Sequence, residues 1–129
     1  MKSENSKFLP YGRQAVTESD INAVVEVLRS HFLTQGPVVP NFEKKVAARV
    51  RAEYGIAVNS ATSALHIACL ALGLKSGEWL WTSPITFVAS ANCGRYCGGK
   101  VDFVDIEPST GLISIPALKD KLKDAEKIG

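Results

Sequence analysis

Long apolar runs are absent from this chain of 129 residues, and so is any strong excess of one charge. No stretch approaches the roughly 18 apolar residues that a membrane-spanning helix needs. The formal net charge is only +2, with lysines and arginines scattered along the chain, so nothing indicates a nucleic-acid partner. The three cysteines are an odd number, and the polar first residues show no secretory signal. Both observations favour a cytoplasmic protein.

Two glycine fingerprints are also missing, the Gly-x-Gly-x-x-Gly of dinucleotide-binding domains and the Gly-x-x-x-x-Gly-Lys-Ser/Thr of P-loops. Their absence argues against a nucleotide-binding oxidoreductase domain, which stays open as an alternative. Cys93 and Cys97 have a spacing that could hold a metal, but no further ligand lies near them in the sequence. We therefore expect no metal site and treat both as buried small hydrophobes. We expect His66 to be structural or solvent-facing.

The residues that are present predict an alternation of strands and helices. Thr17 and Asp20 form a possible capping box for a helix ending near Ser30. A second helix is expected over 39–54, stopped by Gly55. Thereafter the pattern predicts strands at 56–58, 79–81 and 101–106, each followed by a helix, at 62–72, 86–97 and 116–127. This alternation is typical of parallel βαβ units and of an α/β fold.

Ligands of parallel sheets bind beyond the carboxyl ends of the strands, where segments 59–63, 82–87 and 105–110 are expected. Ser60, Thr62 and Ser63 open a helix there, which predicts either a phosphate cradle or a simple helix cap. Phe87 could stack on a flat heteroaromatic ring or anchor the following helix. Asp105 is expected to be a strand-end carboxylate in a turn.

No lysine is a convincing catalytic candidate. Lys100 falls at the entry end of its strand, and Lys75 lies in the loop that enters the second strand. The lysines of the last helix are expected to form a solvated face: Lys119, Lys121, Lys123 and Lys127.

Several segments together resemble the DegT/DnrJ/EryC1/StrS sugar aminotransferases, which are fold-type-I enzymes using pyridoxal 5′-phosphate (PLP). They are Asn-Ser-Ala-Thr-Ser-Ala-Leu at 59–65, Thr-Ser-Pro-Ile-Thr-Phe-Val-Ala-Ser-Ala-Asn at 82–92, Val-Asp-Phe-Val-Asp-Ile at 101–106, and segments 9–14 and 33–37. The resemblance implies the N-terminal part of a three-layer α/β/α large domain. It divides the chain into an arm, 1–16, and a partial PLP-binding domain, 17–129.

The same resemblance implies roles for individual residues. Ala61, Thr62 and Ser63 are expected to hold the cofactor phosphate, and Phe87 to stack on the pyridine ring. The residues expected to face a nucleotide-sugar substrate are Tyr11, His31, Phe32, Leu33 and Thr34.

The activity so implied is transfer of an amino group, from glutamate, to a UDP-linked 4-keto-6-deoxy amino sugar of pseudaminic acid or related surface-glycan biosynthesis, by a homodimer. In the family, the Schiff-base lysine and the aspartate that pairs with the pyridine nitrogen lie beyond residue 129, so we assign no catalytic residue. We expect the isolated chain to be inactive and poorly stable, with open strand edges. A non-catalytic phosphate- or PLP-binding fragment and a segment of a PLP-dependent sugar dehydratase remain alternatives.

Overall fold

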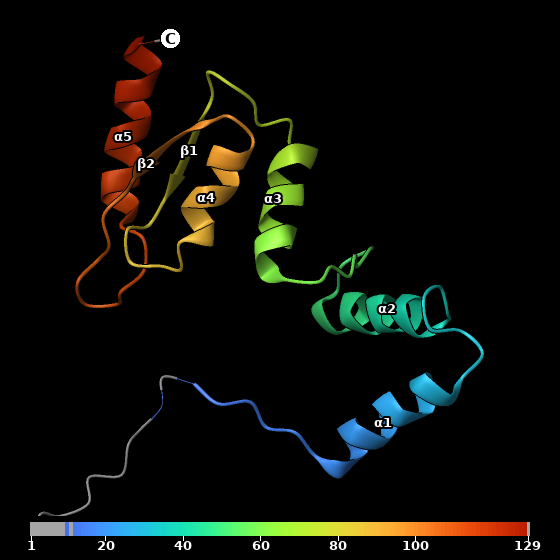
Figure 1. The fold of residues 1–129 in the computed structure, drawn as a ribbon. Coiled ribbons are helices and arrows are strands. Elements are labelled where there is room, and N and C mark those ends of the chain that lie inside the picture. Colours follow the sequence, from blue (N-terminus) through green and yellow to red (C-terminus); the bar gives the residue numbers. More distant parts are fainter. Residues whose placement is uncertain (1–9, 11, 129) are drawn as a thin grey trace, which may run out of the picture. The chain divides into compact units, whose positions relative to one another are not determined.

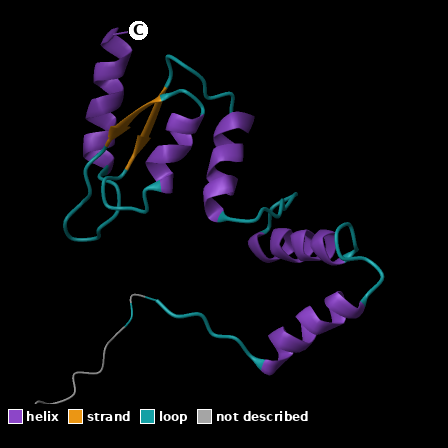
Figure 2. Ribbon diagram, viewed as in Figure 1, coloured by secondary structure: helices purple, strands orange, loops and turns teal. Residues whose placement is uncertain are grey.

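The computed structural model describes residue 10 and residues 12–128, which form five helices and two strands (Figures 1 and 2). The chain divides into two units, 1–57 and 58–129, and each is described here by itself. The helices and strands are α1 (Glu18–Arg29), α2 (Val38–Val50), α3 (Ala61–Ala71), β1 (Trp79–Thr82), α4 (Ala89–Tyr96), β2 (Lys100–Phe103) and α5 (Ile115–Ile128).

Helix α1 begins with the expected capping box. The backbone N–H of Asp20 donates to Oγ1 of Thr17 at 3.3 Å, and the backbone N–H of Thr17 donates to the Asp20 carboxylate at 2.8 Å. The Asp20 carboxylate also accepts from the Thr17 hydroxyl at 2.8 Å, and the bonds that it accepts, first that from the Thr17 backbone N–H and then that from the hydroxyl, lower the pKa of Asp20. The helix ends at Arg29, next to the expected Ser30, so local sequence specifies both of its ends.

Helix α2 ends earlier than the sequence predicts, at Val50 and not near Tyr54. Arg51 leaves the helix in the left-handed conformation, with φ 57° and ψ 35°. Gly55 has a different role from the expected stop signal. A Cβ atom there would lie 2.6 Å from the carbonyl oxygen of Glu43, so glycine allows the chain to pass close against α2.

The strand expected at 56–58 is not formed, which corrects the sequence prediction. The reason is that an extended segment becomes a strand only by pairing, and no strand of the described chain pairs with this one. The backbone N–H of Ala57 donates instead to Oε1 of Glu43 at 2.8 Å.

In the C-terminal unit, β1 and β2 pair in parallel, with Trp79 opposite Lys100 and Thr82 opposite Phe103. Helix α4 connects them and packs on one face of the pair. Gly94 makes this packing close, because a Cβ atom there would lie 2.9 Å from Cβ of Leu80 and 3.3 Å from Cγ2 of Val101. A helix covering a parallel βαβ pair agrees with the expected α/β class.

Three boundaries differ from expectation by a few residues. Helix α4 begins at Ala89 and not at residue 86, since residues 83–87 form an irregular loop. Strand β2 ends at Phe103, and Ile106 forms an isolated antiparallel bridge with Ile113. Helix α5 begins at Ile115, so Pro116 lies in its first turn as predicted.

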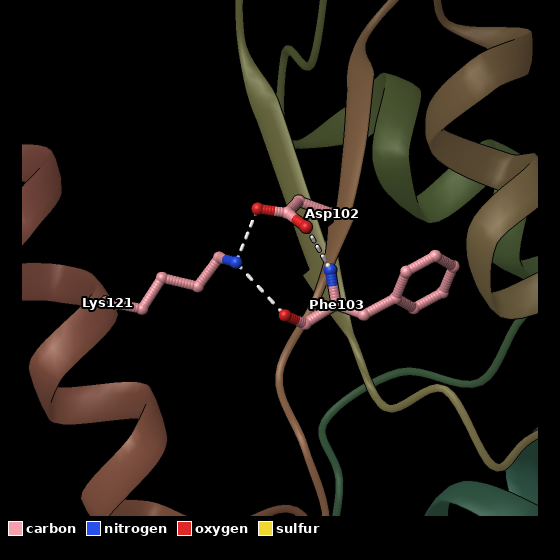
Figure 3. Close-up of polar contacts among 3 residues, drawn as sticks. All are labelled: Asp102, Phe103 and Lys121. Atoms are coloured by element: carbon pink, nitrogen blue, oxygen red, sulfur yellow. Dashed lines mark hydrogen bonds and ion pairs between the residues drawn. The ribbon is translucent and has the colours of Figure 1, made fainter.

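Lys121 of α5 reaches the opposite face of the sheet (Figure 3). Its ammonium pairs with the carboxylate of Asp102 and donates to the carbonyl oxygen of Phe103 at 3.0 Å. It also lies 5.5 Å from the ring centroid of Trp81. The expectation that Lys121 belongs to a solvated face is therefore wrong. Because residues alternate between the faces of a strand, α4 and α5 lie on opposite sides of β1 and β2, as in a three-layer arrangement.

Candidate functional site

The N-terminus of α3 follows directly from an extended residue. Ser60 is the N-cap, with φ −159° and ψ 156°, and its Oγ accepts a hydrogen bond from the backbone N–H of Ser63 at 3.2 Å. The Ser60 carbonyl accepts the first helical bond, from Ala64, at 3.0 Å. Helix capping accordingly uses the backbone N–H of Ser63.

The backbone N–H groups of Ala61 and Thr62 have no acceptor within the part of the chain that the structure describes. Ala61 is exposed and Thr62 is half-buried. The helix dipole adds a partial positive charge at this end, which favours an anion by about 0.3–1 kcal/mol. Two unused amides at a helix N-terminus, with a hydroxyl beside them, fit the donor set that a phosphate group needs.

The hydroxyl of Ser63 is already engaged. Its Oγ donates to Oδ1 of Asn59 at 2.7 Å and lies 3.0 Å from Oγ of Ser60. A serine hydroxyl has one proton to donate, and Asn59 receives it. Within the described chain, the hydroxyl of Thr62 makes no such bond, so Thr62 is the side chain at this helix end that can donate to an anion.

Phe87 lies in the loop between β1 and α4 and is 72% exposed. Its carbonyl oxygen accepts from the backbone N–H of Ser90 at 3.0 Å, which starts α4. Helices α3 and α4 pack against each other, and their N-terminal ends lie at the same end of the unit as the carboxyl end of β1 (Figure 1). The N-terminus of α3 and the loop that carries Phe87 thus lie at the same end of the unit, and the side chain of Phe87 is exposed there.

The residues expected to face the substrate belong to the other unit. Residues 31–34 form an exposed loop between α1 and α2, in which Phe32 and Leu33 are 62% and 63% exposed. Oγ of Ser30 shapes this loop by accepting from the backbone N–H of Phe32 at 3.3 Å. Tyr11 lies outside the described residues.

Two described lysines of the C-terminal unit lie away from the N-terminus of α3. Lys75 and Lys100 lie at the amino ends of β1 and β2, which is the opposite end of the unit. Over residues 10 and 12–128, no group of three or more His, Cys, Asp or Glu side chains is arranged to hold a metal ion. None of the helices in the same residues has the length and apolar character to cross a membrane.

Sequence reasoning missed two features. Asn59 fixes Ser63, although the Asn-x-x-x-Ser spacing of four residues across a helix start could have indicated it. Cys69 of α3 interacts with Cys93 of α4 and with Cys97, the C-cap residue of α4, although the sequence separates Cys69 from Cys93 by a whole strand. Contacts of the second kind depend on the fold and leave no local signal.

Unpaired helix amides beyond the carboxyl ends of parallel strands are typical of the ligand-binding end of an α/β domain. Comparison with known proteins makes the class specific. The chain belongs to the DegT/DnrJ/EryC1/StrS aminotransferase family, whose model matches residues 14–128.

Two curated relatives are similar over most of the chain. The spore coat polysaccharide biosynthesis protein SpsC of Bacillus subtilis is 40% identical over 110 residues, which is 85% of this chain and 28% of that protein. The UDP-4-amino-4,6-dideoxy-N-acetyl-beta-L-altrosamine transaminase of Campylobacter jejuni is 38% identical over 122 residues, or 94% and 32%. The chain therefore spans less than a third of the length of these relatives.

The putative sugar aminotransferase Spr1654 of Streptococcus pneumoniae is a structural neighbour. It matches with a TM-score of 0.81 and 27% identity, over 87% of this chain and 28% of that one. It is known in an apo-form, a PLP-form and a PMP-form. The fold expected from the sequence, the N-terminal part of a PLP-dependent aminotransferase, is confirmed.

Proposed function

We propose that this chain supplies the phosphate-binding edge of a PLP-dependent aminotransferase that acts on a UDP-linked 4-keto-6-deoxy amino sugar. The observation that carries the proposal is the pair of unused amides at Ala61 and Thr62, on the same edge as the exposed ring of Phe87. The family assignment supports PLP as the bound anion. The name of the Campylobacter jejuni relative supports the substrate class, in pseudaminic acid or related surface-glycan biosynthesis.

Each residue at the edge has a defined task in this proposal. The amides of Ala61 and Thr62, with the Thr62 hydroxyl, hold the phosphate, and Ser63 stabilises the turn through Asn59 and Ser60. The ring of Phe87 covers one face of the cofactor and keeps water from it. When bound, PLP supplies an electron sink for the amino transfer.

The substrate loop is a second part of the proposal. We infer that Tyr11 and the exposed residues His31, Phe32, Leu33 and Thr34 contact the nucleotide sugar, as the family resemblance implies. Glutamate as amino donor, a homodimeric assembly and a cytoplasmic location are proposed on the same ground, and so is the division into an arm, 1–16, and a partial PLP-binding domain, 17–129.

We further propose that these 129 residues do not catalyse amino transfer by themselves. Three lysines of the C-terminal unit support this, because Lys75 and Lys100 lie at the amino ends of the strands and Lys121 is engaged by Asp102. A covalent bond between a lysine and the cofactor requires a lysine at the ligand edge.

Titration of the chain with PLP, followed by absorbance, tests the cofactor site. Phe87→Ala should weaken binding about 5–10-fold, since aromatic stacking contributes about 1–1.5 kcal/mol. Ile85→Ala is the matched control, because Ile85 lies in the same loop and is 68% exposed. Equal affinity of the two variants would contradict the role of Phe87, and absence of saturable PLP binding to the unaltered chain would overturn the site.

The reaction itself is tested separately. The whole protein that carries this chain should transfer an amino group from glutamate to a UDP-linked 4-keto-6-deoxy amino sugar, while the 129-residue chain should not. Formation of the amino sugar is measured by mass spectrometry. Turnover by the chain alone would refute the proposed inactivity, and failure of the whole protein with these sugars would refute the substrate class.

A further inference from the structure

The three cysteines of the chain meet where α3 packs against α4. Cys69 lies on α3, Cys93 on α4, and Cys97 is the C-cap residue of α4. Cys69 and Cys93 are 9% and 3% exposed, whereas Cys97 is half-buried. Burial, and hydrogen bonds to the thiols of Cys93 and Cys97, raise the pKa of Cys69 to about 11. Both thiols of the α4 segment are therefore neighbours of the single thiol of α3.

An aromatic contact holds the same two helices together. The rings of His66 on α3 and Tyr96 on α4 meet edge to face, with centroids 5.3 Å apart and an interplanar angle of 61°. His66 lies one turn before Cys69, and Tyr96 directly precedes Cys97. The cysteine cluster thus belongs to a packed interface that keeps Cys69 close to its α4 partners.

Cys69 borders a cavity that is lined by the end of α3, the following loop and β1. Cys69 lines a cavity of about 290 Å³ together with Leu72, Leu74, Glu78, Trp79 and Leu80. Cys97 is the more exposed of the two α4 thiols, and it follows the last turn of the helix. A dissolved oxidant therefore meets Cys97 before the more deeply buried Cys93.

A disulfide between Cys69 and Cys97 would both join the two helices and use the more exposed thiol of the α4 segment. Cys93 and Cys97 lie on consecutive turns of α4, so a bond between them would join nothing to α3. The Sγ of Cys93 donates to the carbonyl oxygen of Ser90 at 3.3 Å, within its own helix. Cys69 is the only cysteine of α3, so any disulfide between the helices must include it.

We propose that Cys69 and Cys97 are a reversible oxidation site, at which a hydroperoxide produces a disulfide that joins α3 to the end of α4. In the first step, the Cys97 thiolate attacks one oxygen of hydrogen peroxide, so that an S–O bond forms and the O–O bond breaks. The other oxygen leaves as hydroxide, which takes up a proton to become water, and a sulfenic acid remains on Cys97. In the second step, the Cys69 sulfur displaces the sulfenic oxygen, and water leaves with the Cys69 proton. Two thiols lose two electrons, and the peroxide is reduced to water.

Trypsin offers a direct test, because Arg95 lies between Cys93 and Cys97. Cleavage after Arg51, Lys75, Arg95 and Lys100 places the cysteines on separate peptides, 52–75, 76–95 and 96–100. Dilute chain is treated with hydrogen peroxide, the remaining thiols are alkylated, and the digest is analysed by mass spectrometry without reductant. We expect peptide 52–75 linked to peptide 96–100, and loss of that species after dithiothreitol.

Two variants distinguish the partners. The linked species should disappear in Cys97→Ser and persist in Cys93→Ser. Because Cys93 is buried, circular dichroism must show that Cys93→Ser keeps its helices. Cys97→Ser changes only a half-buried position, so loss of the linked species in that variant tests the pairing independently. A link from peptide 52–75 to peptide 76–95, a link within 76–100 alone, or a product that forms only between molecules overturns the proposal. None of these readouts depends on PLP or on amino transfer.

Discussion

The hydroxyl of Ser63 donates to Oδ1 of Asn59 at 2.7 Å, across the first turn of α3. This bond distinguishes the hydroxyl of Ser63 from that of Thr62 at the N-terminus of α3. Ser63 stabilises the turn, and the Thr62 side chain stays available to a ligand. Two neighbouring hydroxyl residues that look equivalent in the sequence therefore differ in their hydrogen bonds.

Removing the Thr62 hydroxyl is expected to weaken PLP binding more than removing that of Ser63. A hydrogen bond to a charged group contributes about 1.5–3 kcal/mol, so Thr62→Val should raise the PLP Kd by at least about tenfold. Ser63→Ala keeps its backbone N–H bonded to Ser60 and should change the Kd less than threefold (an order-of-magnitude expectation for a neutral bond). Titration followed by absorbance measures both, and a larger loss in Ser63→Ala would contradict this assignment.

Arg51 offers a test of backbone strain. Its φ of 57° places a side chain in the left-handed region, where residues other than glycine lose about 1–2 kcal/mol. Arg51→Gly should therefore raise the free energy of unfolding by about 1 kcal/mol. Arg51→Ala retains the Cβ atom and should give no such gain. Urea unfolding monitored by circular dichroism compares the two, and equal stabilities would show that the conformation costs nothing.

The contact between Lys121 and Asp102 predicts a dependence on pH. The hydrogen bond from Lys121, and then that from the backbone N–H of Phe103, lower the pKa of Asp102. A carboxyl group whose pKa is lowered by folding stabilises the fold above its unfolded pKa of about 3.9, and this stabilisation is lost as the pH falls through the folded value.

Lys121→Met should raise the pKa of Asp102 toward its ordinary value while keeping an unbranched side chain over Trp81. Lys123→Met is the matched control, since Lys123 pairs with Asp120 on the exposed side of α5. Titration of the Asp102 carboxyl carbon by NMR provides the measurement. An unchanged Asp102 pKa in Lys121→Met would refute the contact.

Cys69 should be alkylated unusually slowly at neutral pH. Its pKa is raised to about 11, so its thiolate becomes abundant only in alkaline solution. Since the unfolded chain has a thiol pKa near 8.5, the fold should lose stability as the pH rises from the unfolded pKa through the folded one. Iodoacetamide labelling of peptide 52–75 as a function of pH measures the shift. A half-maximal rate near pH 8.5 would contradict it.

Local chemistry explains what the sequence predicted well. The capping box of Thr17 and Asp20 and the N-cap Ser60 each involve residues three apart, so their hydrogen bonds can be foreseen without a fold. The start of α4 could not be placed as closely, because Ile85 donates its backbone N–H to Oγ of Ser83 and delays the helix.

Contacts between distant segments account for the errors. Helical periodicity places Lys121 on the outside of α5, but the position of Asp102 on a neighbouring strand decides where its ammonium goes. The meeting of Cys69 with Cys93 and Cys97 depends likewise on the packing of α3 against α4. The N-cap at Ser60 was foreseeable because a hydroxyl residue at a helix start carries a local signal, whereas the bond from Ser63 to Asn59 was not expected.

The bond from Ala57 to Glu43 has a consequence for how segment 56–58 behaves. A carboxylate occupies the very amide that a neighbouring backbone carbonyl would otherwise engage. An additional strand that paired with this segment would have to displace the Glu43 carboxylate from the Ala57 amide. Protonating or removing that carboxylate should therefore make such pairing easier. Hydrogen exchange at the Ala57 amide would report the replacement of the Glu43 carboxylate by a backbone carbonyl.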